Sequence, residues 1–367
     1  MGTIRRMNHS PARRRWLALT PALLASSCVH PEPAPPRVAG PHARLRELLL
    51  AMAADDSNTH GVLVRQAGQT LAEAYFTATD RPGGAWFSRE VAFGPETLHD
   101  LRSISKSVVG LLTGIAIARG LVGATSRAVF DFFPEHADLV TPERRALTVQ
   151  HLLDMATGWD WNEEAYSYAD PRNSETRMSI ALDPLRHVLE LPFVATPGTK
   201  WEYCGGATLV LAEILERQAR APLATLAQDW LFAPLGVRRF EWRTGRGGKA
   251  LAFSGLRLAP RDLATVGELL LTRGRHAGQD VVPADWIDWT RSPRYTGWDR
   301  YRYAAQWWHS QEGAALTWVG GWGNGGQRLL VVPDRELVVV VTAGRYNQPQ
   351  NGRASMQLFA RIVEALG

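Results

Sequence analysis

The sequence predicts an α+β fold in which one antiparallel sheet, built from both ends of the chain, is flanked by helices, and a mainly helical region is inserted. Three observations support this fold class. Strand-like runs occur at 61–76 and again at 327–344. The chain between them is dominated by apolar residues at helical spacing. Helical patterns at 43–54 and 355–366 can cover the sheet.

The N-terminal elements follow from local patterns. Residues 43–54 (ARLRELLLAMAA) are rich in helix-forming residues, and 61–76 contains two strand patterns around a turn at Ala67–Gly68. The segment 107–119 is apolar at helical spacing, and the following Gly120 is a residue that commonly ends helices. Further helical patterns lie at 148–156, 185–192, 206–218, 260–274 and 284–290.

Strand character returns near the C-terminus. The runs QRLLVVP (327–333) and ELVVVVTAG (336–344) flank Pro333–Asp334–Arg335, as expected of a hairpin. The expected partition is an α/β part at about 43–100 and 311–367 and a mainly helical part at about 101–310. A site between the two parts follows from this arrangement.

The composition is that of a folded protein. The 367 residues include 45% apolar and 21% charged residues, which argues against disorder. The formal net charge is +5, and residues 1–27 hold five arginines and no acid, so the rest of the chain is balanced. This balance gives no indication of nucleic-acid binding.

Residues 1–27 are expected to form a signal peptide, because an arginine-rich start precedes the short apolar run Trp16 to Ala25 and then small residues. That run is too short to cross a bilayer. The sequence LLASSC resembles a bacterial lipobox, which indicates lipidation of Cys28; an ordinary signal peptide cut nearby is the alternative. The Pro-rich residues 28–42 fit a tether. We therefore expect an exported, periplasmic or cell-envelope protein whose membrane contact is this lipid anchor.

The chain has two cysteines, Cys28 and Cys204. If Cys28 is lipidated or removed, no disulfide can form within the mature chain. The exported domain would then depend on its apolar core.

Lys106 is one of three lysines among 41 basic residues, and it follows Ser103 by three positions. Arginine keeps its proton at ordinary pH, whereas a desolvated lysine can lose it. Residues i and i+3 share a helix face, and a helix N-terminus favours a nucleophilic oxygen and an oxyanion. We therefore expect a neutral Lys106 to take the proton of Ser103, which then attacks a carbonyl. A chance pair on a solvated helix end is the alternative.

The segment LRSISKSVVGLLTGIAIARGLV (101–122) resembles the serine beta-lactamase and penicillin-binding-protein superfamily, whose first motif is Ser-x-x-Lys. The resemblance is to its class C-like branch of esterases, D-peptidases and 6-aminohexanoate-dimer hydrolases. Further similar blocks follow in the family's order at 147–161, 197–216, 232–237, 255–271 and 323–342. The resemblance covers about residues 45–365 and implies a beta-lactamase/transpeptidase-like fold.

The resemblance places Tyr203 at the tyrosine of the family's Tyr-x-Asn motif. A nearby lysine ammonium favours the phenolate, so Tyr203 and Lys106 would share the proton relay. Gly205 stands where the motif has asparagine. An amide that would orient an amide-bearing substrate is therefore missing.

The family's third motif, Lys-Thr-Gly or His-x-Gly, falls on Asn324, Gly325 and Gly326. By resemblance this segment faces the nucleophile and binds substrate, and its glycines allow close approach. The backbone N–H groups of Ser103 and Gln327 would form the oxyanion hole. Asn324 replaces the lysine that would help to hold a beta-lactam carboxylate.

Three further residues are candidates for substrate contact. Arg345, shortly after the last strand, could supply a carboxylate partner in place of that lysine. Tyr166 and Tyr168 belong to an aromatic cluster and, by analogy with the nylon-oligomer branch, could touch the substrate. For each aromatic residue, packing in the core is the alternative.

We expect neither a metal ion nor an organic cofactor. The run GWGNGG (321–326) fits G-x-G-x-x-G, but a strand-like run follows where a nucleotide-binding helix should begin. No histidine pair has metal-ligand spacing, and no Cys-x-x-Cys occurs.

The favoured function is a serine hydrolase that cleaves a small ester or amide substrate through an acyl-enzyme on Ser103. A beta-lactamase or a D-amino-acid peptidase acting on cell-wall peptides is one alternative, weakened by the departures at Gly205 and Asn324. A non-catalytic envelope protein that binds such peptides is another. The presence of Ser103, Lys106 and Tyr203 argues against a pure binding protein.

Overall fold

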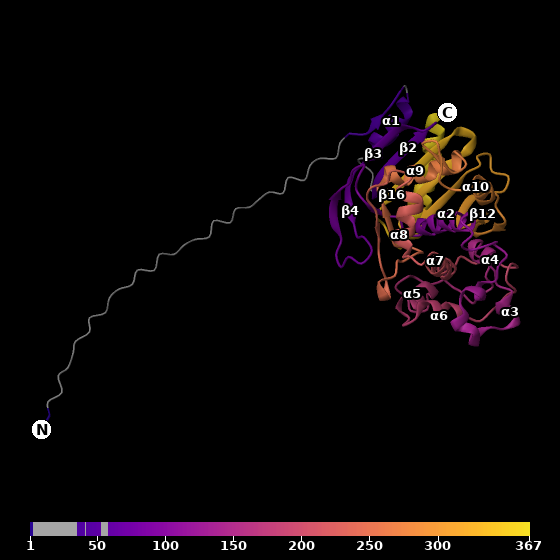
Figure 1. Cartoon of the computed structure of the whole chain (residues 1–367). Helices are drawn as coiled ribbons and strands as arrows, with labels where there is room; N and C mark the ends of the chain where they lie inside the picture. Colours follow the sequence, from indigo (N-terminus) through magenta and orange to yellow (C-terminus); the bar gives the residue numbers. More distant parts are fainter. Residues whose placement is uncertain (3–34, 41, 53–57) are drawn as a thin grey trace. The chain divides into compact units, whose positions relative to one another are not determined.

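The computed structural model describes residues 1–2, 35–40, 42–52 and 58–367 (Figure 1). Residues 3–27 of the predicted signal peptide, the predicted lipidation site Cys28 and most of the predicted tether lie outside these residues, and these assignments stay predictions. Residues 37–38, inside the predicted tether, instead form a short edge strand. None of the helices in the described part of the chain is long and apolar enough to cross a bilayer.

The predicted fold class is confirmed by a nine-stranded antiparallel sheet with the order β1-β3-β2-β16-β15-β14-β13-β12-β11. The N-terminal strands meet the C-terminal strands where β2 pairs with β16. The strands of this sheet are β1 (Arg37–Val38), β2 (Thr59–Gln66), β3 (Gln69–Tyr75), β11 (Tyr295–Thr296), β12 (Tyr301–Ala304), β13 (Trp307–Gln311), β14 (Val319–Gly323), β15 (Gln327–Val332) and β16 (Leu337–Ala343). The turn between β2 and β3 lies at Ala67–Gly68, as predicted, and both residues have positive φ.

The sheet extends further than predicted. Strands β11 to β13 occupy 295–311, so the predicted helical part, which was expected to end at about 310, ends before them. The segment YRYAAQWWHS (301–310) is rich in the aromatic residues that strands favour. The runs are only a few residues long, and their partners lie elsewhere in the chain, so the sequence pattern missed them.

Helices cover both faces of the sheet. Val62 and Val64 face the side on which α1 and α11 pack against each other, whereas Leu63 faces α2 and α9. This alternation follows the two-residue period of a strand. The helices are α1 (Ala43–Met52), α2 (Ile104–Ala118), α3 (Pro142–Arg145), α4 (Val149–Leu153), α5 (Ser174–Ile180), α6 (Pro184–Leu189), α7 (Gly205–Ala219), α8 (Leu223–Ala227), α9 (Pro260–Leu271), α10 (Ala284–Thr290) and α11 (Pro349–Leu366).

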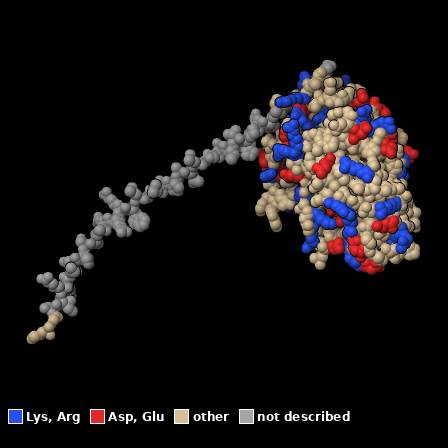
Figure 2. Space-filling view, in the orientation of Figure 1, with Lys and Arg blue, Asp and Glu red and all other residues tan. Residues whose placement is uncertain are grey.

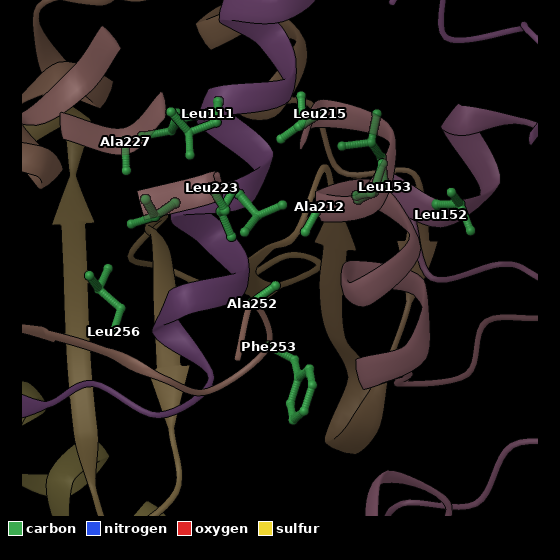
Figure 3. Close-up of a cluster of buried hydrophobic side chains, with 14 of the residues drawn as sticks. Leu111, Leu152, Leu153, Ala212, Leu215, Leu223, Ala227, Ala252, Phe253 and Leu256 are labelled. Carbon is green, nitrogen blue, oxygen red and sulfur yellow. The ribbon is translucent and has the colours of Figure 1, made fainter. Parts of the chain in front are cut away.

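Helix α2 links the sheet to the helical part, because it contacts β14 on one side and α7 on the other. Apolar side chains from α2, α4, α7, α8 and the segment 252–256 form one cluster around it (Figure 3). This packing fixes the position of Phe253. Short strands outside the main sheet are β4 (Thr77–Asp80), β5 (Arg89–Ala92), β6 (His99–Asp100), β7 (Glu241–Trp242), β8 (Leu256–Leu258), β9 (Arg275–His276) and β10 (Gln279–Asp280).

The visible surface carries both signs of charge. Figure 2 shows Lys and Arg interspersed with Asp and Glu on this face. This distribution agrees with the balanced charge of the chain after residue 27.

Acid is expected to destabilise this fold through His309 on β13. Burial lowers the pKa of His309 from 6.5 to about 3. In the unfolded chain this imidazole becomes protonated near pH 6.5, whereas in the folded chain it stays neutral down to about pH 3. The free energy of unfolding therefore falls as the pH drops from 6.5 towards 3. Between pH 7 and pH 5 this side chain should cost about 2 kcal/mol. Urea unfolding at both pH values should show a smaller loss for His309→Gln than for the wild type; equal losses would contradict this assignment.

Candidate active site

Ser103 lies at the N-terminal end of α2, and its hydroxyl forms no capping bond to the helix. The residue before it, Arg102, has a φ of 52°, which is uncommon for a residue with a side chain. One turn further on, Lys106 Nζ donates a hydrogen bond of 3.0 Å to Ser103 Oγ. The two side chains are therefore adjacent, at the spacing that an i, i+3 pair on a helix predicts.

Lys106 is enclosed by the protein, with only 1% of its surface exposed. Its Nζ also donates to the carbonyl oxygen of Phe253 at 3.0 Å, and Phe253 is fixed by the apolar cluster of Figure 3. The same nitrogen lies 4.9 Å from the centre of the Tyr203 ring. Lys106 thus contacts two segments that are distant from it in sequence.

Two buried glutamates that the sequence analysis missed face this lysine. Glu163 Oε1 lies 3.9 Å and Glu175 Oε2 lies 3.6 Å from Lys106 Nζ. Burial, together with the neighbouring Glu163, raises the pKa of Glu175 well above its ordinary value. Glu175 is therefore shifted towards its protonated form.

Glu163 is held by three hydrogen-bond donors. Its carboxylate accepts from Trp161 Nε1 at 3.0 Å, from the Tyr168 hydroxyl at 3.0 Å and from the Gly205 N–H at 2.8 Å. Hydrogen bonds to the ionised form favour a buried carboxylate. Glu163 is therefore a fixed negative charge beside the lysine.

The charge state of Lys106 differs from the sequence expectation of a neutral amine. Burial by itself lowers the pKa of Lys106, but Tyr203, Glu163 and Glu175 outweigh it, and the net effect raises the pKa. The free protein therefore holds an ammonium. Burial by itself favours the neutral amine of a lysine, and Tyr203 together with the two carboxyl groups reverses this effect.

Tyr203 is buried just before α7. Burial is the largest effect on Tyr203 and raises its pKa to about 12. Lys106 and a hydrogen bond with the Ser103 side chain oppose this increase, and Glu163 adds to it. Its ring packs against Trp298 and Trp308, with ring centres 4.8 Å and 5.7 Å away. Ser103, Lys106 and Tyr203, expected to act together, therefore do lie together.

The segment between β14 and β15 comes close to the start of α2. A Cβ at Gly323 would lie 2.2 Å from the carbonyl oxygen of Leu101, so only glycine allows this approach. Gly325 and Gly326 follow with φ of 92° and 99°, in the region that favours glycine. No nucleotide-binding helix follows; β15 begins at Gln327, as the sequence predicts. The buried Gln327 is held through side-chain bonds to Ala343.

A cleft of about 430 Å³ opens over Ser103. The predicted contacts Tyr166, Tyr168, Asn324, Gly325 and Gly326 all line it, and Tyr203 does as well. The other residues that line the cleft are Glu163, Glu164, Ser167, Trp298, Trp308, Trp322, Gly323, Arg328, Asn347, Gln348 and Gly352. Three indoles among them make part of the wall apolar.

One group of metal-ligating residue types occurs in the described part of the chain, and it lies outside the cleft. The fold brings His60, Asp80 and His99 together, although their spacing in sequence gave no sign of it. His60 Nδ1 and His99 Nε2 are 2.7 Å apart, the length of a hydrogen bond. The outer ring nitrogens face the carbonyl oxygens of Thr79 and Asp100.

The fold and this geometry agree with comparisons to known proteins. The profile of the Beta-lactamase family matches residues 50–360. The chain belongs to the beta-lactamase family. The 6-aminohexanoate-dimer hydrolase of Paenarthrobacter ureafaciens is 28% identical over 307 residues, covering 78% of this chain and 72% of that protein.

Two solved structures resemble this beta-lactamase family member in fold. EstCE1, a hydrolase with promiscuous acyltransferase activity, has a TM-score of 0.69 and 17% identity over 88% of this chain and 98% of its own. A penicillin-binding protein homologue from Caulobacter crescentus has a TM-score of 0.66 and 17% identity over 89% of this chain and 99% of its own. At such low identity the two structures show a shared fold only.

This beta-lactamase family member departs from the family motifs at Gly205 and Asn324. A Cβ at Gly205 would lie 2.6 Å from Glu175 Oε2 and 3.3 Å from Glu163 Oε2, so the carboxyl pair occupies the space of the missing side chain. The Asn324 amide exchanges two hydrogen bonds of 2.7 Å with Asn347. The predicted substitute Arg345 is not among the cleft-lining residues.

Proposed function

We propose that this protein is a serine hydrolase that cleaves an ester or a small amide through an acyl-enzyme on Ser103. The observation that carries the proposal is the 3.0 Å hydrogen bond from Lys106 Nζ to Ser103 Oγ, with Tyr203 beside both and a cleft above. Membership of the beta-lactamase family and the hydrolase names of relatives support it. No step of this chemistry calls for a cofactor.

In the proposed reaction, Ser103 Oγ bonds to the carbonyl carbon while its proton passes to the Tyr203–Lys106 pair. The N–H groups of Ser103 and Gln327 hold the oxyanion. The bond to the leaving group breaks, and the leaving group takes the proton from the pair. Water then adds to the acyl carbon, gives a proton to the pair and releases the acid, and Ser103 regains its proton.

Both members of the relay are protonated in the free protein, because the pKa values of Lys106 and Tyr203 are raised. The pair must therefore lose a proton before it can accept that of Ser103. Activity should accordingly rise with pH from neutral towards alkaline values.

An ester or small amide fits this cleft better than a beta-lactam or a D-peptide. In the third motif a neutral Asn324, hydrogen-bonded to Asn347, stands where a cation would bind the carboxylate of a beta-lactam. Gly205 has no side-chain amide that could orient the amide of a peptide substrate. The indoles of Trp298, Trp308 and Trp322 provide an apolar wall for the acyl part. The relative from Paenarthrobacter ureafaciens is named for hydrolysis of an amide dimer, which supports the small-amide class.

Acylation of Ser103 tests the proposal directly. After brief incubation with p-nitrophenyl acetate and acid quenching, mass spectrometry should place one acetyl group on Ser103. The same peptide contains Ser105 and Ser107, whose buried hydroxyls are bonded to Arg102 and Gln306 carbonyl oxygens and serve as internal controls. No label with several activated esters, or label on either control serine, would contradict the proposal and favour a non-catalytic binding protein.

A further inference from the structure

Two histidines and an aspartate meet in the interior of the protein, outside the cleft over Ser103. His60 lies on β2, Asp80 is the last residue of β4, and His99 lies on β6. All three are buried, with at most 6% of any one residue exposed. A ring nitrogen of each histidine and a carboxylate oxygen of Asp80 lie within 4.8 Å of one another. The proposed hydrolysis uses none of these side chains.

The outer ring nitrogens show where the ring protons lie. His60 Nε2 is 3.1 Å from the carbonyl oxygen of Thr79, and His99 Nδ1 is 3.0 Å from that of Asp100. A carbonyl oxygen only accepts hydrogen bonds, so each of these two nitrogens carries the proton of its ring. In a neutral imidazole the other nitrogen is then an acceptor with a free lone pair.

The inner ring nitrogens therefore direct two lone pairs at each other. His60 Nδ1 and His99 Nε2 are only 2.7 Å apart. With one proton on each ring and both protons facing outwards, none is left to lie between the rings. Moving one proton inwards would leave a bare nitrogen against a carbonyl oxygen. The arrangement is complete only with a cation between the rings, either a third proton or a metal ion.

Burial disfavours the third proton, because it would turn one ring into a buried imidazolium. Burial lowers the pKa of His60 to about 3 and that of His99 to about 4. Phe93 stacks on the His60 ring, with ring centres 4.0 Å apart, and adds an apolar wall. A metal ion, in contrast, binds neutral imidazole through its free lone pair.

The surroundings of the pair are those of metal-binding histidines. A metal-binding histidine usually donates its other ring N–H to a carbonyl oxygen or a carboxylate, which fixes the ring. Both His60 and His99 do so here. The Asp80 carboxylate is oriented as well, because the Tyr346 hydroxyl donates to its Oδ1 at 3.0 Å. Buried charges in proteins are typically paired or coordinate metals, and a cation would compensate this one.

We propose that His60 Nδ1, His99 Nε2 and the Asp80 carboxylate bind one zinc-type divalent cation. Imidazole nitrogens and carboxylate oxygens bind Zn²⁺ at about 2.0–2.2 Å, so ligand atoms around a tetrahedral ion lie about 3.3 Å apart. On binding, the two nitrogens separate slightly and Asp80 turns towards them. The sequence gave no sign of this site because its residues are not at metal-ligand spacing along the chain.

The cation would join three strands just before the nucleophile. It would connect His99 to β2 of the main sheet and to β4, and β6 leads directly into residues 101–103. The neighbouring Asp100 is fixed already, since its carboxylate accepts from the Gly83 N–H at 2.6 Å and pairs with Arg257 Nε at 2.8 Å. We therefore expect a structural metal site that stabilises the fold and makes no contact with the substrate.

The test measures the metal content of the protein without a polyhistidine tag, produced in medium supplemented with ZnCl₂. Elemental analysis after desalting should find about one divalent metal ion per chain. Removal of the metal by EDTA should lower the Tm by at least about 3 °C, and ZnCl₂ should restore it. Copper or nickel in place of zinc would support the same site. Less than about a tenth of an ion per chain, with a Tm that ZnCl₂ does not change, would overturn the proposal and leave a shared proton between the rings.

Two variants remove only the inner nitrogens. In His60→Gln the amide nitrogen takes the place of Nε2, and in His99→Asn it takes that of Nδ1, so each variant keeps the bond to its carbonyl oxygen. Both should lose the metal and the response of the Tm to ZnCl₂. His309→Gln, which replaces a buried histidine outside this group, is the matched control and should keep both. Metal retained in both site variants would place it elsewhere and overturn the proposal.

A spectrum of the wild-type protein does not depend on whether the variants fold. Protein refolded from urea and EDTA with CoCl₂, and then desalted, should show the intense visible bands of four-coordinate Co²⁺. A weak spectrum like that of hydrated Co²⁺ would contradict the proposed set of ligands. All of these measurements are independent of ester hydrolysis, so their outcome does not affect the proposed function of Ser103.

Discussion

Replacing Ser103 by alanine is expected to lower kcat/KM for p-nitrophenyl acetate and butyrate by at least about a thousandfold. The substitution removes the cleft-lining hydroxyl to which Lys106 Nζ donates a hydrogen bond. Lys106→Arg should be comparably damaging. A guanidinium cannot exchange a proton at ordinary pH, and the fully enclosed site has no room for the longer side chain.

Lys200→Arg provides the matched control for the lysine substitution. Lys200 is paired with Glu202 on the surface, and its side chain is 57% exposed, so an arginine should be accepted there without loss. Circular dichroism and urea unfolding should show that the variants are folded. If Lys106→Arg were as active as the wild type, Lys106 would have no role in proton transfer, and the Ser103 mechanism would need another base.

The second large effect is expected at Glu163. Glu163→Gln should lower the free energy of unfolding by about 3 kcal/mol, because it removes the carboxylate that compensates buried Lys106. In the wild type the carboxylate accepts hydrogen bonds from the indole of Trp161, the hydroxyl of Tyr168 and the N–H of Gly205. The amide group of a glutamine would face at least one of these donors with its own N–H, so that hydrogen bond would be lost. Ester hydrolysis should fall as well, since the charge state of Lys106 depends on this carboxylate.

Glu175→Gln is the matched control, with the same substitution on the neighbouring side chain. Because burial and the neighbouring Glu163 raise the pKa of Glu175, a glutamine there replaces a side chain that already favours its neutral form. The cost should be at most about 1 kcal/mol. Urea unfolding at pH 7 compares the two variants. A larger loss in Glu175→Gln than in Glu163→Gln would mean that the proton sits on Glu163.

Much of the fold could be predicted because its elements depend on local patterns. The helix after Ser103, the helix after Tyr203 and the hairpin at 327–344 each carry their own periodicity and turn residues. The strands at 295–311 were missed because they are short and gain their stability from neighbours far away in the chain. The predicted end of the helical region was wrong for that reason.

The amino-acid sequence by itself determined the pairing of Ser103 with Lys106, because residues three apart on a helix meet whatever surrounds them. It also determined membership of the family, through motifs spread over nearly the whole domain. Only the tertiary structure decided the charge on Lys106, since Glu163 and Glu175 reach it from segments about sixty residues away. Electrostatic energies depend on distance and burial in space, and the sequence pattern does not contain them.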